Sequence, residues 1–274
     1  MKKILLAFER SSFSRAAMQM AVEIHKSSPI MLTAAFLPET HIPNIWAELA
    51  IPVSNGYTDT IVEQESSAAV KKSIQLFNRT CERYRIEHSI HSHSGETGLS
   101  ELIKESRFAD LLILGTDQFT PTQNTGIRLS NYLDSLLHSA ECPVLLVPNK
   151  ATLPTNTILC YDGSGASSFA IKQFAYLFPE LCNNPAMLVH MSKEEELPLN
   201  LLVQELLQAH FPDISIETID PKEKDYFSNW ISSKKGVVLV AGAFERSEIS
   251  RVFKRSFIAS MMEAHQLPIF IAHR

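Results

Sequence analysis

The sequence predicts an α/β protein built from two tandem, doubly wound domains. Two observations lead to this expectation: the chain repeats itself at long range, and its strand-like segments are continuous apolar runs. Because strands without polar alternation are covered on both faces, these runs indicate parallel sheets sandwiched between helices. A chain of 274 residues is long enough for two domains of about 130 to 140 residues, each with its own core.

The first repeated unit is a strand, a helix and a second strand. Residues 4–11 (ILLAFERS) recur as residues 157–164 (TILCYDGS), and each copy is an apolar run that ends in an acid, any residue and a serine. Apolar residues at helical spacing follow both copies. Short apolar runs at residues 30–36 and 186–191 then complete the unit. The repeat therefore predicts two copies of one supersecondary structure.

The two halves also end alike. Residues 110–115 match residues 237–242, and residues 142–147 match residues 267–272. Each half is completed by a further helix and strand, expected at residues 61–83 and 86–93 and at residues 194–211 and 214–219. The matching ends indicate that the repeat spans both halves, so we expect domains at residues 1–149 and 157–274.

Two connecting segments stand outside the repeat. Residues 148–157 contain two prolines and little apolar content, which is typical of a linker. Residues 38–60 carry the apolar cluster Ile45, Trp46 and Leu49 and have no counterpart in the second half. Long inserts tend to be lids or binding loops, so this segment is a candidate contact surface.

Composition excludes several partners. A formal net charge of -5 gives no basic field for nucleic acid. The first apolar run stops at Glu9 and Arg10, too short for a signal peptide or a membrane span, which predicts a cytoplasmic protein without membrane contact. The four cysteines are far apart with no CxxC pair, so we expect buried free thiols.

Three features together resemble the universal stress protein family: a first strand ending in Asp162, Gly163 and Ser164, a penultimate strand ending in Gly242, and a last helix running into an x-Pro-apolar strand. The resemblance covers nearly the whole chain, twice. It implies that each domain is a five-stranded parallel sheet flanked by helices, of the Rossmann-like, adenine nucleotide alpha hydrolase-like type. It also implies a role in stress response, with pairing through the last strands inside the chain or in a homodimer.

The resemblance also implies a nucleotide motif from which this chain departs. ATP-binding members of that family carry Gly-x-x-Gly, nine residues, and Gly-Ser or Gly-Thr after the fourth strand. The second half keeps Gly242, but Glu245 replaces the second glycine and Arg255 with Ser256 replaces Gly-Ser. Because glycine lets backbone N–H groups approach phosphate oxygens closely, a triphosphate held in the usual way is not expected here.

The first half departs further. Gly115 and Thr116 begin a loop without the second glycine, Ser130 stands at the Gly-Ser position, and Glu9 with Arg10 replaces Asp-Gly after the first strand. ATP or another adenine nucleotide is therefore a weaker expectation in this half than in the second.

The second half offers the better candidate crevice, because ligands of doubly wound folds bind at the carboxyl ends of the strands flanking the switch in strand order. Asp162 can accept hydrogen bonds from a ribose hydroxyl, and the N–H groups after Gly163 and Ser164 lie at a helix N-terminus. Arg255 can bind a phosphate or carboxylate, or it can plug the pocket and pair with Glu245.

Other chemistry is less well supported. His91 and His93 share one face of a short strand, but no third ligand matches them, which favours a surface or edge position over a metal site. Ser164 or Ser167 is expected to cap a helix, and this role is favoured over a nucleophilic serine at Ser164. No catalytic residues are expected, so the sequence favours a binding protein. Two alternatives stay open: an enzyme performing slow phosphate chemistry on a bound nucleotide, and a scaffold that contacts partners through residues 38–60.

Overall fold

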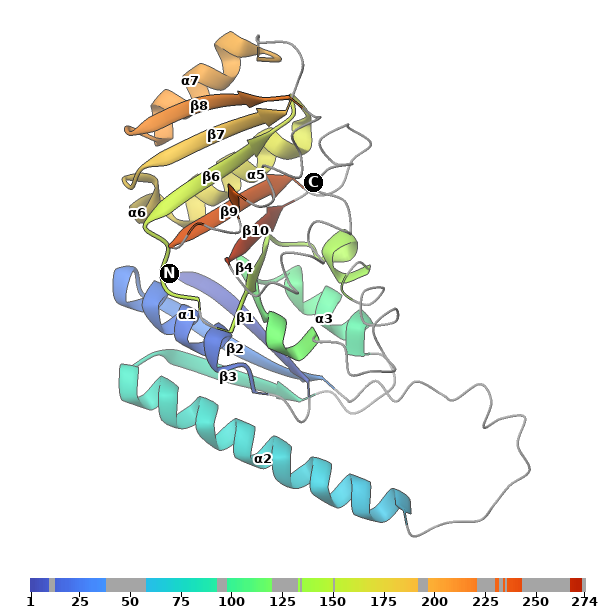
Figure 1. Cartoon of the computed structure of the whole chain (residues 1–274). Coiled ribbons are helices and arrows are strands. Elements are labelled where there is room, and N and C mark those ends of the chain that lie inside the picture. Colours follow the sequence, from blue (N-terminus) through green and yellow to red (C-terminus); the bar gives the residue numbers. More distant parts are fainter. Residues whose placement is uncertain are drawn as a thin grey trace, which may run out of the picture.

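The strands of the protein join into one continuous sheet. The computed structural model describes residues 1–9, 13–37, 58–92, 98–119, 133, 135–149, 151–191, 197–220, 230–231, 234, 236–242 and 267–272. The strands are β1 (Lys2–Glu9), β2 (Ile30–Leu37), β3 (Glu87–Ser92), β4 (Leu111–Gly115), β5 (Val144–Val147), β6 (Asn156–Tyr161), β7 (Ala186–Met191), β8 (Ile214–Ile219), β9 (Val237–Gly242) and β10 (Ile269–Ala272). Their order in the sheet is β3-β2-β1-β4-β5-β10-β9-β6-β7-β8 (Figure 1).

The sheet consists of two groups of five strands with the same internal order. Within each group the neighbouring strands are parallel. The groups meet at β5 and β10, the last strands of the two halves, which pair antiparallel. The prediction of an α/β fold with parallel sheets flanked by helices is confirmed.

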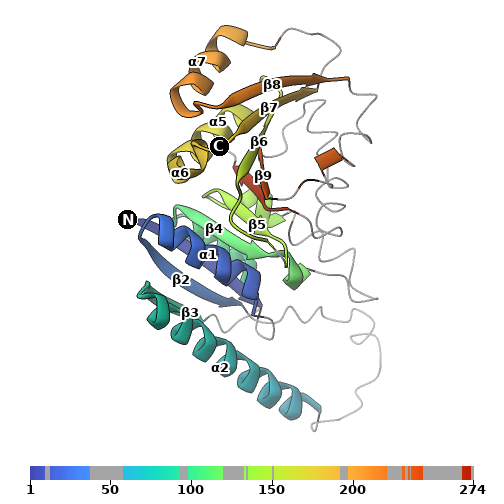
Figure 2. The same cartoon turned by 60° about the vertical axis from the view of Figure 1, so that its left-hand side comes forward.

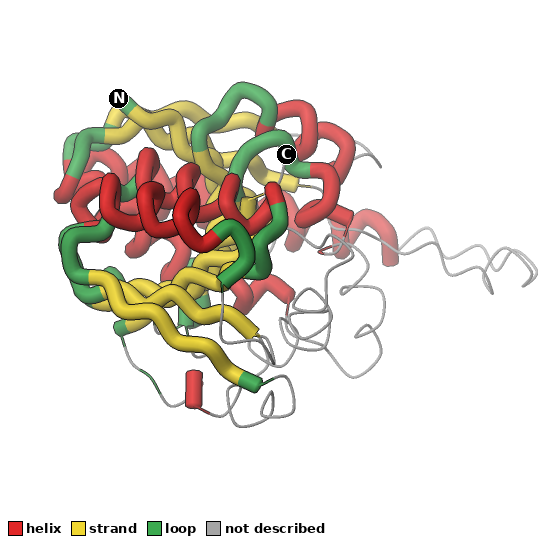
Figure 3. The backbone as a smooth tube through the Cα atoms, turned by 90° about the horizontal axis from the view of Figure 1, so that it is seen from above, coloured by secondary structure: helices red, strands yellow, loops and turns green. Residues whose placement is uncertain are grey.

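Helices lie on both faces of the sheet, and Figure 2 labels those of one face, among them α1 and α5. The helices are α1 (Arg15–Ser27), α2 (Thr58–Tyr84), α3 (Gly98–Ser106), α5 (Gly165–Leu177), α6 (Pro179–Cys182) and α7 (Asn200–His210), with a 3-10 turn η1 at Thr116–Phe119. Buried residues of α1, α2, α5, α6 and α7 belong to the apolar cluster on one face, and Leu102 of α3 belongs to the cluster on the other. Figure 3 gives the same layers from above, with helices in red and strands in yellow.

The apolar core is divided by the sheet rather than by the linker. One cluster contains Leu6 of β1 together with Leu159 of β6, and the other contains Leu5 of β1 together with Ile158 of β6. Side chains that alternate along each strand point to opposite faces, so each half contributes to both clusters. The expectation of a separate core in each domain therefore differs from the structure, in which two apolar layers each span both halves because the sheet is continuous through β5 and β10. The division into domains at residues 1–149 and 157–274 stays a prediction.

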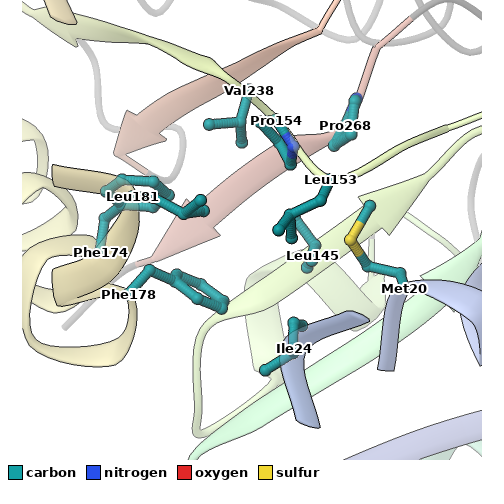
Figure 4. Close-up of a pocket in the computed structure, with 10 residues that line it drawn as sticks. All are labelled: Met20, Ile24, Leu145, Leu153, Pro154, Phe174, Phe178, Leu181, Val238 and Pro268. Carbon is teal, nitrogen blue, oxygen red and sulfur yellow. The ribbon is translucent and has the colours of Figure 1, made fainter. Parts of the chain in front are cut away.

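An apolar pocket lies where the two halves meet (Figure 4). Its lining comes from α1, β5, the linker, α5, α6 and β9, with Phe178 between α5 and α6 and Pro268 before β10. These residues are Met20, Ile24, Leu145, Leu153, Pro154, Phe174, Phe178, Leu181, Val238 and Pro268. Leu153 and Pro154 therefore pack against both halves, so this part of the linker contributes to the contact between them.

The four cysteines are buried and free, as the sequence predicts. Burial raises the pKa of the Cys81, Cys142 and Cys182 thiols to about 12 and raises that of Cys160 still further. Among the helices that the structure describes, none is both long and apolar enough to cross a membrane.

Candidate functional site

The strand order places a candidate crevice in each half. β1 lies between β2 and β4, and β6 lies between β7 and β9. In each half the chain therefore adds strands first on one side of this central strand and then on the other. In doubly wound sheets the crevice opens at the carboxyl ends of the strands where this change of side occurs. The two crevices are therefore at the ends of β1 and β4 and at the ends of β6 and β9.

In the second half, a tight polar turn joins β6 to α5. The Asp162 carboxylate Oδ1 accepts a hydrogen bond from the Ser164 backbone N–H at 2.9 Å. The Ser164 hydroxyl Oγ accepts from the Ser167 N–H at 3.1 Å, and Ser164 is the N-cap of α5. The predicted capping role of Ser164 is confirmed. The side chains of Asp162 and Ser164 thus satisfy two backbone donors that would otherwise be exposed at this helix end.

Gly163 lies in the middle of this turn with a positive φ of 77°. A Cβ atom at this position would lie 2.6 Å from Cβ of Pro198, closer than packed atoms come. Glycine is thus required by both the backbone conformation and the approach of Pro198. The turn is closed on this side by residues 197–199.

Gly242 packs the end of β9 directly onto α5. A Cβ at Gly242 would lie 2.6 Å from both the Ala166 carbonyl carbon and the Ser167 backbone nitrogen. Strand and helix backbones are therefore in contact, which fills the space between them. A ligand in this half therefore has to lie outside the N-terminal end of α5 rather than between the helix and β9.

The first turn of α5 is open at Gly165. This residue is exposed, and a Cβ atom placed on it meets nothing within 4 Å. The N–H groups of the first helical turn point out of the helix end, where the helix dipole favours negative charge. The combination of an exposed helix start and the neighbouring Asp162 turn is the most ligand-like arrangement in the described part of the chain.

In the first half, the corresponding contact uses a side chain. Ser14 is the N-cap of α1, and its Oγ accepts from the Ala17 N–H at 3.2 Å. A Cβ at Gly115 would overlap the Ser14 side chain and the Asp117 carboxylate. Thr116 follows β4 and is 4% exposed, and its hydroxyl has no hydrogen-bond partner in the described part of the chain.

The residues beneath the two crevices differ in polarity. In the first half Phe8 stacks on Phe13 at 4.8 Å and on Phe36 at 5.3 Å between ring centroids. In the second half the registered pair is Tyr161 and His190, as Phe8 and Phe36 are paired across β1 and β2. The Tyr161 hydroxyl donates to the Pro198 carbonyl at 2.8 Å. Burial raises the Tyr161 pKa, and the nearby Asp162 charge raises it further.

The structure places some of the predicted site residues and not others. Asp162, Gly163, Ser164 and Gly242 come together around the start of α5, and Gly115 and Thr116 lie at the end of β4 near α1. Glu9 ends β1. The candidates that lie outside the described residues are Ser130, Glu245, Arg255, Ser256, His93 and the cluster Ile45, Trp46 and Leu49.

Sequence reasoning missed Pro198, Tyr161, His190 and Ser14. Pro198 meets Gly163 only after β7 has intervened, so no local pattern reveals the contact. His190 reads in the sequence as one polar residue within an apolar strand. A polar residue within such an apolar run, together with a tyrosine in the strand before it, is a sequence signal that could have indicated a buried polar contact.

A metal site gains no support in the region that the structure covers, where no group of three or more His, Cys, Asp or Glu side chains could hold an ion. His91 lies on β3, an edge strand, and its Nδ1 is 2.9 Å from Oε2 of Glu105. The predicted edge position is confirmed for His91.

The fold is that of a doubly wound α/β protein with a candidate crevice at the strand ends of each half. A family model describes the chain further. The model of the universal stress protein family matches residues 1–148, and the chain belongs to this family.

Solved structures of low sequence identity share the fold. A universal stress protein from Archaeoglobus fulgidus is 13% identical with a TM-score of 0.68, covering 100% of this chain and 96% of its own. A Pseudomonas aeruginosa structure described within the same family is 12% identical with a TM-score of 0.53, covering 99% of this chain and 93% of its own. No curated protein matches the sequence. Family membership implies a role in stress response.

Proposed function

We propose that the protein acts in stress response by binding a small anionic ligand, an adenine nucleotide, at the carboxyl ends of β6 and β9, without catalysing its turnover. The observation that carries this proposal is the open first turn of α5 at Gly165, next to the turn formed by Asp162, Gly163 and Ser164. A helix N-terminus attracts a phosphate, and a carboxylate beside it can accept from sugar hydroxyls.

The donors of the turn limit how the ligand is held. The Ser164 N–H is bonded to Asp162, and the Ser167 N–H is bonded to Ser164. Gly165 therefore provides the exposed backbone position at the helix start. One such position suits one phosphate group better than a chain of three. Together with the contact between Gly242 and α5, this favours AMP or ADP over ATP.

We also propose that residues 1–149 and 157–274 are tandem domains of a cytoplasmic protein, which further associates as a homodimer. The same strand order in the two halves supports the tandem. The net charge of -5 argues against nucleic acid as a partner.

The test is nucleotide binding measured by native mass spectrometry and thermal unfolding. AMP or ADP at millimolar concentration should raise the melting temperature, because a ligand that binds only the native state stabilises it by mass action. Asp162→Asn keeps an oxygen that can accept from the Ser164 N–H but removes the charge. We expect about tenfold weaker binding, since hydrogen bonds to charged groups contribute roughly 1.5 to 3 kcal/mol.

Asp213→Asn is the matched control, because Asp213 is exposed before β8 and its backbone carbonyl alone bonds to Ala186. The control should bind like the unmodified protein. Absence of any nucleotide-dependent stabilisation would contradict the binding proposal. Steady phosphate release that Asp162→Asn abolishes would contradict its non-enzymatic part.

A further inference from the structure

The turn that carries Asp162 is held from two sides by buried polar groups. On one side, the Tyr161 hydroxyl bonds to Pro198, which lies against Gly163, and on the other the His190 side chain bonds to the Tyr161 backbone. Tyr161 is the last residue of β6 and directly precedes Asp162. Its backbone and its side chain are both engaged, so any movement of the turn must pull on these contacts.

The first contact is a bond from Tyr161 to the segment that covers the turn. The Tyr161 side chain is 1% exposed, and its hydroxyl donates to the Pro198 carbonyl at 2.8 Å. Pro198 in turn lies against Gly163. The neighbouring Leu199 has a positive φ of 52°, which costs a leucine about 1 kcal/mol and has to be offset by surrounding contacts. The tyrosine hydroxyl supplies such a contact.

The second contact satisfies a carbonyl at the end of β6. Pairing between β6 and β9 reaches only as far as Leu159 with Val240. Beyond that point, the Tyr161 carbonyl accepts a hydrogen bond from His190 Nδ1 at 2.9 Å. Because a carbonyl oxygen only accepts, Nδ1 must carry the hydrogen. His190 is 4% exposed, so the bond is protected from water.

The first half lacks both polar groups. Phe8 occupies the position of Tyr161, and Phe36 occupies the position of His190, with the rings stacked. Phenylalanine can make neither bond. The polar contacts therefore occur in the half that also carries the Asp-Gly-Ser turn, which links them to that turn rather than to the fold as a whole.

We propose that Tyr161 and His190 are positioning residues of the crevice at β6: they hold Asp162, Gly163 and Ser164 in the geometry that binds the ligand, without touching it. This inference rests on the proposed nucleotide binding and adds the residues on which affinity depends. It also explains why His190 and the Tyr161 hydroxyl, two polar groups, are buried beside this turn.

The test compares replacements that keep or remove the His190 donor. His190→Phe installs the residue that the first half uses and removes the bond to the Tyr161 carbonyl. His190→Asn retains an N–H donor of similar reach. Tyr161→Phe removes the bond to Pro198, and Tyr176→Phe is the control, because Tyr176 is an exposed residue of α5 whose ring contacts His210.

Two readouts are measured on the full chain. The first is hydrogen exchange of the Gly163 and Ser164 amides without ligand, which we expect to speed up about tenfold in His190→Phe and by less than about twofold in His190→Asn. The second is ADP affinity by calorimetry, expected to weaken about 5- to 10-fold in His190→Phe and about threefold in Tyr161→Phe. Tyr176→Phe should change neither.

The outcomes separate the two proposals. If the unmodified protein binds no nucleotide, the proposed function fails, and the exchange of the Gly163 and Ser164 amides alone decides whether the turn is held as inferred. If ADP binds but His190→Phe and His190→Asn weaken it equally, or if neither residue alters exchange of the turn, the positioning role is wrong. Equal melting temperatures of the two His190 variants with unequal ADP affinities would support it over a general effect on packing.

Discussion

The two candidate crevices share one packing contact and differ in what surrounds it. Gly115 packs against Ser14 in the first half, and Gly242 packs against Ser167 in the second. Both serines lie three residues after the serine that ends the repeated strand motif, at Ser11 and Ser164. The approach of the fourth strand to the first helix is therefore the same in both halves. What differs is the helix end, because α5 begins at Gly165 whereas α1 begins only at Arg15.

The two halves thus share the residues that pack strand against helix and differ in the residues around that contact. The glycines at the ends of β4 and β9 serve packing, which both halves need. The helix of the second half extends a turn further, and its buried neighbours Tyr161 and His190 are polar where the first half has Phe8 and Phe36. Replacements at the shared contact should therefore affect stability most, and replacements at the helix starts beside it should affect stability less.

The largest expected effect is at the shared glycines. Gly242→Ala should lower the free energy of unfolding by about 3 kcal/mol, because its Cβ would meet backbone atoms of Ala166 and Ser167 that cannot move without shifting α5. Gly115→Ala should cost a similar amount, because its Cβ would overlap both Oγ and Cβ of Ser14, and rotation of the serine side chain cannot move its Cβ. Denaturant unfolding measures both.

Gly165→Ala is the control for these glycines, since its Cβ would lie in open space. Its effect should stay within about 0.5 kcal/mol. A loss for Gly115→Ala as small as that for Gly165→Ala would mean that the end of β4 does not pack closely on Ser14, and the contact would then not be shared by the two halves.

A smaller effect is expected at the helix caps. Ser14→Ala and Ser164→Ala each remove an oxygen that accepts a backbone N–H. Ser14 is fully buried, so in Ser14→Ala the Ala17 N–H would lose its acceptor with no water to replace it. We expect the free energy of unfolding to fall by about 1.5 kcal/mol. Ser164 is partly exposed, and the loss there should be about 1 kcal/mol.

Thermal and denaturant unfolding of the two serine variants, with Ser168→Ala as a third, test this order. Ser168 lies within α5, and its hydroxyl donates to the Ser164 carbonyl rather than accepting at the helix end. Its replacement should therefore cost least. A larger loss at Ser164 than at Ser14 would show that the exposed turn matters more to stability than the buried cap.

The fold was predictable because each strand is a continuous apolar run and the runs recur. The helix expected at residues 61–83 is α2, found at Thr58–Tyr84, and the strand expected at residues 86–93 is β3. The helix expected at residues 194–211 is α7, which begins later than expected, at Asn200, because Leu199 before it is in the left-handed conformation; residues 192–196 lie outside the described residues. Periodicity determines such elements locally, which is why they could be read from the sequence.

The candidate site could be predicted only in part. The turn at Asp162, Gly163 and Ser164 was identifiable because acid, glycine and serine at a strand end have local roles. The contacts that hold it were not, because Pro198 and His190 reach it across β7 and depend on register between strands. Ser14 was missed because aligning Ser11 with Ser164 suggests equal helix starts, whereas the first helix begins a turn later.

The smallest effect is expected in the chemical reactivity of the cysteines, which report on how the two halves open. Cys81 and Cys142 lie in the first half, and Cys160 and Cys182 lie in the second. Because burial raises the pKa of Cys81, Cys142 and Cys182 to about 12, almost no thiolate forms near pH 8 in the folded protein, and iodoacetamide should modify none of them.

Raising the pH should weaken this protection in a defined direction. A folded-state pKa above the unfolded value means that folding favours the protonated thiol, so its contribution to stability is full below about pH 8.5 and declines as pH rises towards 12.

In mild urea at pH 8, alkylation followed by peptide mass spectrometry should modify all four cysteines at one common rate, because both apolar layers span both halves. Faster modification of Cys160 and Cys182 than of Cys81 and Cys142 would show that the second half opens separately from the first. The two halves would then unfold as independent units rather than as one cooperative sheet.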